Sequence, residues 1–163
     1  MMVIDSSTLI LLAKAGLLDK VIDHAKTKMT IPQKVLDEAT RKEGLADAQL
    51  IKRRVSDQTI DLRPVKDRQL YAKIVKDFNM GLGEAEALTL CLEHQGTLIS
   101  DDKKAMNACK VFQVPFATAA NLLVELHRTK HLSREETQAA IYSLGRFGRY
   151  SAEYIRKMKE DCR

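Results

Sequence analysis

Short apolar runs alternate along the chain with longer stretches of helical periodicity. The two clearest runs are Met2 to Ile4 and residues 97–100, and weaker ones lie at 28–31, 59–62 and 114–117. A strand that is apolar throughout, without alternation, is typical of a parallel sheet covered on both faces. These runs therefore predict a buried parallel sheet.

Between the strands, apolar residues recur every three or four positions, which predicts helices. The predicted helices are 9–15, 17–25, 32–42, 45–55, 66–78, 84–94, 103–111, 118–130, 133–144 and 151–161. Strands that alternate with helices at this spacing predict an α/β fold, with a central parallel β-sheet flanked by helices on both faces. The last helices add a C-terminal portion to this core.

Acidic side chains follow both clear strands. Asp5 comes directly after the first strand, and Asp101 and Asp102 follow the second. The carboxyl ends of parallel strands meet at one edge of the sheet, where ligands gather. We therefore expect these acids to open into one crevice, with either Ser6 or Ser7 capping the helix after Asp5.

Helical phase distinguishes between the acids of two helices. Glu84 and Glu86 are two residues apart, so they lie about 200° apart around their helix. Glu84 shares the inward face, and Glu86 is predicted to point to solvent. By the same reasoning Glu38 faces inward, whereas Asp37 is a surface residue.

Clustered carboxylates resist joint ionisation, so such a set requires raised pKa values or a divalent cation. Magnesium or manganese is the natural partner of a site made of oxygen ligands. Each acid alone has a simpler explanation: Asp5 is a helix cap, Glu84 and Asp102 complement helix dipoles, and Glu38 is solvated. Their order, their places at strand ends and their inward phase together favour a site.

Four motifs carry a family resemblance. They are Val3-Ile4-Asp5-Ser6-Ser7, Ile31-Pro32 with Val35-Leu36-Asp37-Glu38, Gly83-Glu84-Ala85-Glu86-Ala87-Leu88, and Leu98-Ile99-Ser100-Asp101-Asp102. Together they resemble the successive motifs of PIN-domain proteins, especially the VapC-related group of prokaryotic nucleases, over residues 2 to about 130. The resemblance implies a PIN-like fold with an acidic pocket that holds Mg²⁺ or Mn²⁺. It also implies a ribonuclease that prefers single-stranded RNA and that is often a homodimer.

Carried over residue by residue, the first acid of the family falls on Asp5, the second on Glu38 and the third on Glu84. The fourth falls on Asp101 or Asp102, and the doubled aspartate leaves both open. We expect these five to be the catalytic acids, and all of them except Glu38 to be metal ligands.

The resemblance also suggests a division of the chain. Residues 1–130 are expected to form the PIN-like nuclease domain, and residues 131–163 a C-terminal helical extension packed on it. Because this extension goes beyond the compact toxin pattern, a toxin role and an antitoxin partner are left open.

The net charge of +5 favours an anionic partner, and nucleic acid is the commonest one. Candidates for a basic rim around the site are Lys103, Lys104, Arg53, Arg54, Arg146 and Arg149. Aromatic residues make up 5% of the chain, so base stacking is not expected to be the main source of affinity.

Several other classes of protein are disfavoured. Three cysteines without CxxC spacing argue against a disulfide framework and a structural zinc site. His127 and His131 have zinc-helix spacing, but the glutamate of that motif is missing. No apolar run approaches the roughly 20 residues that span a bilayer, so a soluble, cytoplasmic protein is expected.

Three functions fit this sequence to different degrees. The favoured one is a Mg²⁺- or Mn²⁺-dependent ribonuclease. A PIN-like module without useful nuclease activity, serving in regulation or nucleic-acid binding, is the main alternative. A phosphorylated receiver domain fits less well, because such domains need two acids together after the first strand and here Ser6 follows Asp5.

Overall fold

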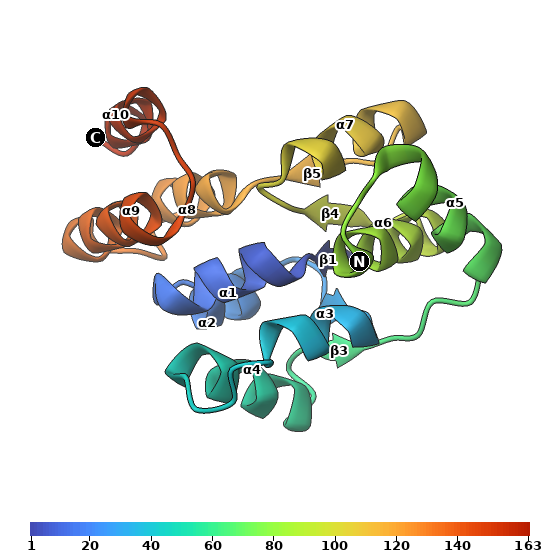
Figure 1. Ribbon diagram of the computed structural model, residues 1–163. Coiled ribbons are helices and arrows are strands. Elements are labelled where there is room, and N and C mark those ends of the chain that lie inside the picture. Colours follow the sequence, from blue (N-terminus) through green and yellow to red (C-terminus); the bar gives the residue numbers. More distant parts are fainter.

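A computed structural model describes all 163 residues and contains one parallel sheet. Its strands lie in the order β3-β2-β1-β4-β5, and every neighbouring pair is parallel (Figure 1). The strands are β1 (Met2–Ile4), β2 (Met29–Ile31), β3 (Asp61–Leu62), β4 (Thr97–Ile99) and β5 (Phe116–Ala117). The predicted α/β fold is confirmed.

Ten helices connect the strands and follow them. They are α1 (Ser6–Lys14), α2 (Leu18–His24), α3 (Gln33–Ala39), α4 (Ala46–Ser56), α5 (Arg68–Phe78), α6 (Leu82–His94), α7 (Lys103–Phe112), α8 (Ala119–Arg128), α9 (Arg134–Phe147) and α10 (Ala152–Asp161). Every predicted helix is present. The largest differences are at α1, which begins at Ser6, and at α3 and α9, which end at Ala39 and Phe147.

The strand order explains why helices cover both faces of the sheet. The chain passes from β1 outward to β2 and β3, and then crosses back to β4 and β5. Because crossovers between parallel strands are right-handed, the outward and return paths place their helices on opposite faces. The central strands are thereby enclosed, and Val3, Ile4 and Leu98 have no exposed surface.

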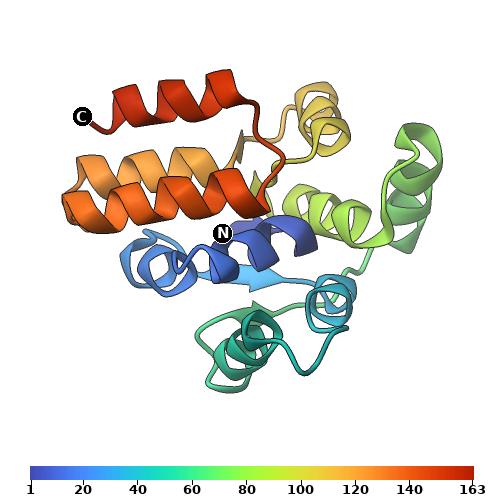
Figure 2. The ribbon, with the colours of Figure 1, turned by 60° about the vertical axis from the view of Figure 1, so that its left-hand side comes forward.

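The three last helices lie side by side at one flank of the molecule (Figure 2). Helix α9 packs against α8, α10 and α1, with Ile141 and Leu144 buried. The chain turns sharply at Gly148, where an added Cβ would lie 2.6 Å from the carbonyl oxygen of Leu144. This turn directs residues 148–150 toward the carboxyl edge of the sheet.

The point at which the strand order reverses lies between β1 and β4. These strands are neighbours, with Ile4 paired to Ile99, and the Asp5 N–H donates to the Ile99 carbonyl at 3.1 Å. The connections after them leave toward opposite faces, which opens a crevice outside their carboxyl ends. The first acid and the acids after β4 therefore flank the same opening.

Candidate active site

Asp5 is completely buried at the end of β1. One carboxylate oxygen accepts the Thr8 N–H at 2.8 Å, and the other accepts the hydroxyl of Ser100. Asp5 itself is thus the N-cap of α1, and the prediction that Ser6 or Ser7 caps it is wrong, because the helix starts one residue after the strand. Burial raises the pKa of Asp5, and the nearby Asp101 charge raises it further.

The two acids after β4 have different surroundings. Asp101 accepts the Tyr150 hydroxyl and the Ala119 N–H, the latter at 3.3 Å, and burial raises its pKa. Asp102 caps α7 by accepting the Ala105 N–H at 2.9 Å. Asp101 is therefore tied to the C-terminal segment, whereas Asp102 starts the next helix.

Glu84 lies in the first turn of α6, half-buried, and faces the acids at the strand ends. Burial raises its pKa, and so do the charges of Asp102, Asp5 and Glu38. Its one hydrogen bond is from the N–H of Gly81, at 3.2 Å, at the start of its own helix. The inward direction that helical phase predicts for Glu84 agrees with these surroundings.

Glu38 connects three helices near the same opening. Its carboxylate accepts the Ser6 hydroxyl of α1 at 2.7 Å and the Gly83 N–H of α6 at 3.1 Å. A side chain at Gly83 would displace this carboxylate from the place that it occupies. Glu38 accordingly holds the start of α6 in place.

A cavity of about 390 Å³ brings some of these acids together. Glu84, Asp101 and Asp102 line this space, which we call the acid cavity, and Arg149 lines it from the C-terminal segment. Asp5 and Glu38 do not line this cavity. A hydrogen bond from the Thr8 N–H links Asp5 to the cavity wall, and a hydrogen bond from the Gly83 N–H links Glu38 to the residue before Glu84.

No basic side chain neutralises this group of acids. None of the five predicted site residues forms an ion pair with lysine, arginine or histidine. The donor set contains only carboxylate oxygens, which suits a hard divalent cation. However, no three acidic, histidine or cysteine side chains stand close enough together to hold a metal ion as they lie. The residues therefore fit such a cation by their chemistry, and side-chain adjustment is needed to complete its coordination.

Glu86 does not point to solvent, and that prediction is wrong. Its side chain accepts the Lys34 N–H at 2.8 Å and the Arg68 guanidinium at 3.1 Å, and the residue is only 5% exposed. Both faces of α6 are covered, by α5 and α7 as well as by the sheet, so no side of its middle turns is solvated.

The predicted basic rim is wrong at one helix. Helix α4 leads into the amino end of β3, so Arg53 and Arg54 lie toward the edge of the sheet opposite to the acids. Arg54 is also paired with Asp19 at 2.7 Å and with Asp57 at 3.1 Å. Arg149, by contrast, lines the cavity with the acids.

The lysines after Asp102 are both exposed. Lys104 donates to the Asn79 carbonyl at 3.1 Å, whereas Lys103 makes no hydrogen bond to the protein. Helix α7 thus offers at least one free cation near the acids.

Two side chains around the acids were not predicted. Ser100 lies beside Asp5 on the neighbouring strand, and a strand-end serine opposite a strand-end acid is a signal that the sequence does contain. Tyr150 reaches Asp101 from 49 residues away, across the turn at Gly148. Only the tertiary path of the chain reveals that contact.

Comparisons with known proteins bear on this arrangement. No helix of the protein has the length and apolar character that a membrane crossing requires. No curated protein has a matching sequence. A family model, DUF3368, described as a PIN domain, matches residues 1–160, and so includes α9 and most of α10. A closer relation to the VapC group stays a prediction.

The family match agrees with the geometry around β1 and β4. PIN domains have a nuclease-type fold, act on nucleic acid and typically use divalent metal ions. The protein has a parallel sheet, and acids lie beyond its central strands. With nearly its whole length matched, the chain belongs to the DUF3368 family of PIN domains.

Proposed function

We propose that this protein is a metal-dependent ribonuclease that hydrolyses phosphodiester bonds of RNA at the cavity beyond the carboxyl ends of β1 and β4. One observation carries the proposal: acids from several elements converge there without any basic partner, and the pKa values of Asp5, Glu84 and Asp101 are raised. Perturbed carboxylates in a cleft are a physical indication of a functional site.

The residues fit Mg²⁺ or Mn²⁺ held by Asp5, Glu84, Asp101 and Asp102. When bound, such a cation would supply the Lewis acid that lowers the pKa of the attacking water and offsets charge on the phosphate. The hydrogen bonds from Ser100 and Thr8 to Asp5, and from Tyr150 to Asp101, hold the carboxylates in fixed directions. Outer hydrogen bonds of this kind orient ligands, and removing one typically weakens metal affinity or activity by about 10- to 100-fold.

Two further residues act beside the proposed metal ligands, one on a ligand and one on the substrate. Glu38 positions the start of α6, and with it Glu84, through the N–H of Gly83. Arg149 is exposed on the wall of the cavity and presents a guanidinium, the group best suited to bind a phosphate through two parallel hydrogen bonds. RNA in single-stranded form is the proposed substrate, by analogy with PIN-domain nucleases.

A second function is favoured by one observation. No three metal-binding side chains are gathered closely enough for a metal ion. A PIN module that binds nucleic acid without cleaving it would need no such gathering. The experiment below separates the two.

The test is cleavage of a panel of RNAs and single-stranded DNAs in Mg²⁺, Mn²⁺ or EDTA, with the parent protein and Asp5→Asn. The expected result is cleavage that requires metal, leaves a 5′-phosphate and is lost in Asp5→Asn while RNA binding persists, because basic side chains supply that affinity. Products ending in 2′,3′-cyclic phosphate, or cleavage in EDTA, would contradict hydrolysis by activated water. Metal-indifferent RNA binding without cleavage would support the binding module.

A further inference from the structure

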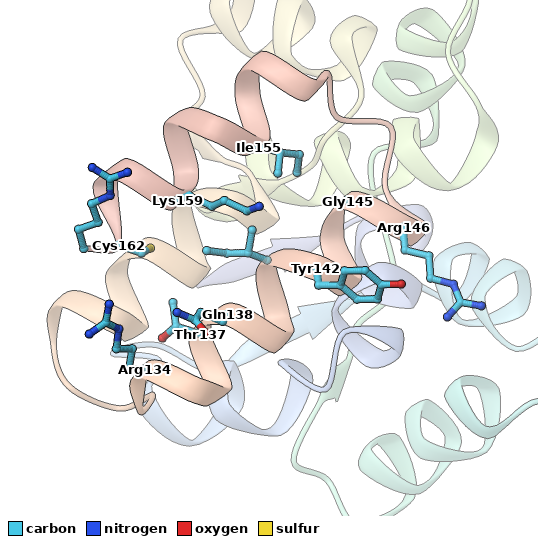
Figure 3. Close-up of a pocket in the computed structure, with 11 residues that line it drawn as sticks. Arg134, Thr137, Gln138, Tyr142, Gly145, Arg146, Ile155, Lys159 and Cys162 are labelled. Carbon is cyan, nitrogen blue, oxygen red and sulfur yellow. The ribbon is translucent and has the colours of Figure 1, made fainter.

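A second cavity lies away from the acids, between α9 and α10 (Figure 3). Its volume is about 650 Å³, and no acidic residue lines it. Its polar rim carries Arg134, Tyr142 and Arg146 from α9, Lys159 from α10, and Arg163 at the end of the chain. We call this cavity the C-terminal groove.

Helix α9 runs along the groove and ends beside the acid cavity. Arg134, Tyr142 and Arg146 follow one another at multiples of four residues, so they form a stripe along one side of α9. Arg146 lines the groove, and the next residue, Phe147, lines the acid cavity together with Arg149. The last turn of α9 therefore contributes to both cavities.

The cations of the groove are free. Arg134, Arg146, Lys159 and Arg163 form no ion pair, whereas Arg54, Arg63, Arg68 and Arg128 elsewhere in the chain are each bound to a carboxylate. Unpaired guanidinium and ammonium groups are available to phosphates, and charge-assisted hydrogen bonds to phosphate are among the strong ones. The groove is thus suited to a polyanion.

Two aromatic rings of α9 are exposed, Tyr142 in the C-terminal groove and Phe147 at the acid cavity. Tyr142 is 69% exposed and Phe147 is 46% exposed. The Lys14 ammonium lies 5.7 Å from the centre of the Phe147 ring, and the Arg146 guanidinium lies 5.3 Å from it. Exposed rings beside cations are the combination by which proteins hold single strands, with bases stacked and phosphates paired.

We propose that the C-terminal groove binds the part of a single-stranded RNA that extends beyond the acid cavity, with a base stacked on Tyr142 and phosphates on the unpaired cations. This inference rests on the proposed function, since it takes the substrate from there. The exposed rings favour RNA over an acidic peptide, because the bases of RNA stack on aromatic rings whereas acidic side chains would pair only with the cations. Helix α9 has 14 residues and is about 21 Å long, which corresponds to about six nucleotides of a stacked strand.

The test compares two RNAs, one of four nucleotides that reaches only the acid cavity and one of twelve. Cleavage in Mn²⁺ is measured for the parent, for Tyr142→Ala and for Arg134→Ala combined with Lys159→Ala. Arg156→Ala is the matched control, because Arg156 lies on α10 but lines a different surface together with Glu153 and Glu160. All four side chains are exposed, so none of these variants is expected to unfold.

The expected result is a loss of about 10-fold in kcat/KM on the longer RNA, with the shorter RNA and the control unaffected. An equal loss on both RNAs, or none on the longer one, would overturn the inference. If the parent cleaves neither RNA, the proposed function fails, and binding of the longer RNA, measured by fluorescence anisotropy, still decides the groove. Unchanged RNA binding in Tyr142→Ala, together with polyglutamate binding that is lost when Arg134→Ala is combined with Lys159→Ala, would make the groove a peptide site and overturn the proposal.

Discussion

Glu84 and Glu86 are two residues apart on one helix and lie in opposite electrostatic surroundings. Glu86 is nearly inaccessible, yet a backbone N–H of α3 and the guanidinium of Arg68 on α5 compensate its charge. We call this arrangement the Glu86 junction. Glu84 is more exposed but has no cation; it lines the acid cavity with Asp102, and the charges of Asp102 and Asp5 raise its pKa.

The difference between these regions shows that burial alone does not identify a functional acid. A buried carboxylate with an ion pair and a hydrogen bond joins elements of the fold, as Glu86 joins α3, α5 and α6. Carboxylates that repel one another without a compensating cation have raised pKa values. A metal cation that binds between them relieves the repulsion, so its binding is favoured there.

The largest effect is expected on cleavage. Glu84→Gln should reduce RNA cleavage at least about 100-fold, since a lost ligand matters more than a lost outer hydrogen bond. The matched change Glu86→Gln, on the same helix, should stay within about threefold of the parent. Initial rates in Mn²⁺ measure both, and circular dichroism checks that both variants fold. Equal losses would remove the distinction between the two acids.

The next effect is on stability in metal. A cation that binds only the folded state at 100 times its Kd adds about 2.7 kcal/mol, which for a domain of this size raises Tm by roughly 5 to 10 °C. Thermal melts in EDTA and in millimolar Mn²⁺ measure the shift. Asp5→Asn should shrink it, whereas Glu86→Gln should leave it intact. A Tm that neither Mg²⁺ nor Mn²⁺ changes would count against the acid cavity as a metal site.

The Glu86 junction should lose stability when its cation, Arg68, is removed. Arg68→Ala leaves a buried carboxylate with one hydrogen bond, and we expect it to lower the free energy of unfolding by about 1 to 2 kcal/mol, since Arg68 itself is largely solvated. Urea denaturation measures this loss. Arg149→Ala, at the acid cavity, has no ion pair to lose and should change stability by less than about 0.5 kcal/mol.

The smallest effect is on the pH dependence of stability. The pKa values of Asp5, Glu84 and Asp101 are raised in the folded state, so their protonation stabilises the fold at low pH. That stability is lost as the pH rises from about 4 through the folded pKa values. Exposed acids with lowered pKa values, such as Asp19, oppose this trend only below about pH 4.

Without metal, Tm should therefore fall from mildly acidic to neutral pH, and Asp5→Asn should flatten the slope. Melting curves in EDTA between about pH 4.5 and 7.5 would reveal it. A Tm that rises across this range in the parent would contradict the uncompensated state of these acids.

Strand-end features could be predicted from the sequence because they are local. An apolar run followed by Asp5, and another followed by Asp101, fix where the acids lie once the strands are parallel neighbours. The same local reasoning gave the helices and the α/β fold. It offered Asp5 as a helix cap only when that acid is taken alone, and otherwise placed the cap at Ser6 or Ser7, since the one-residue spacing between β1 and α1 depends on where the strand stops.

Helical phase succeeded for Glu84 and failed for Glu86 for one physical reason. Helical periodicity predicts side-chain direction only if the helix has a solvent-exposed face, but the residues from Ala85 to Cys91 are all buried. An acid on such a helix must find a partner, and Arg68 lies 18 residues away in sequence. Likewise, the contact of Tyr150 with Asp101 depends on the packing of α9 against α1, which no local pattern contains.

The most direct test of the contrast between the acids is calorimetric titration of Mn²⁺ into the parent protein, Glu84→Gln and Glu86→Gln. If the uncompensated carboxylates form the metal site, the parent and Glu86→Gln bind Mn²⁺ with similar affinity, and Glu84→Gln binds it at least about 10-fold more weakly. If Glu84→Gln binds Mn²⁺ as tightly as the parent, or if Glu86→Gln loses the metal equally, then Glu84 is not the ligand that the structure indicates and the account is wrong.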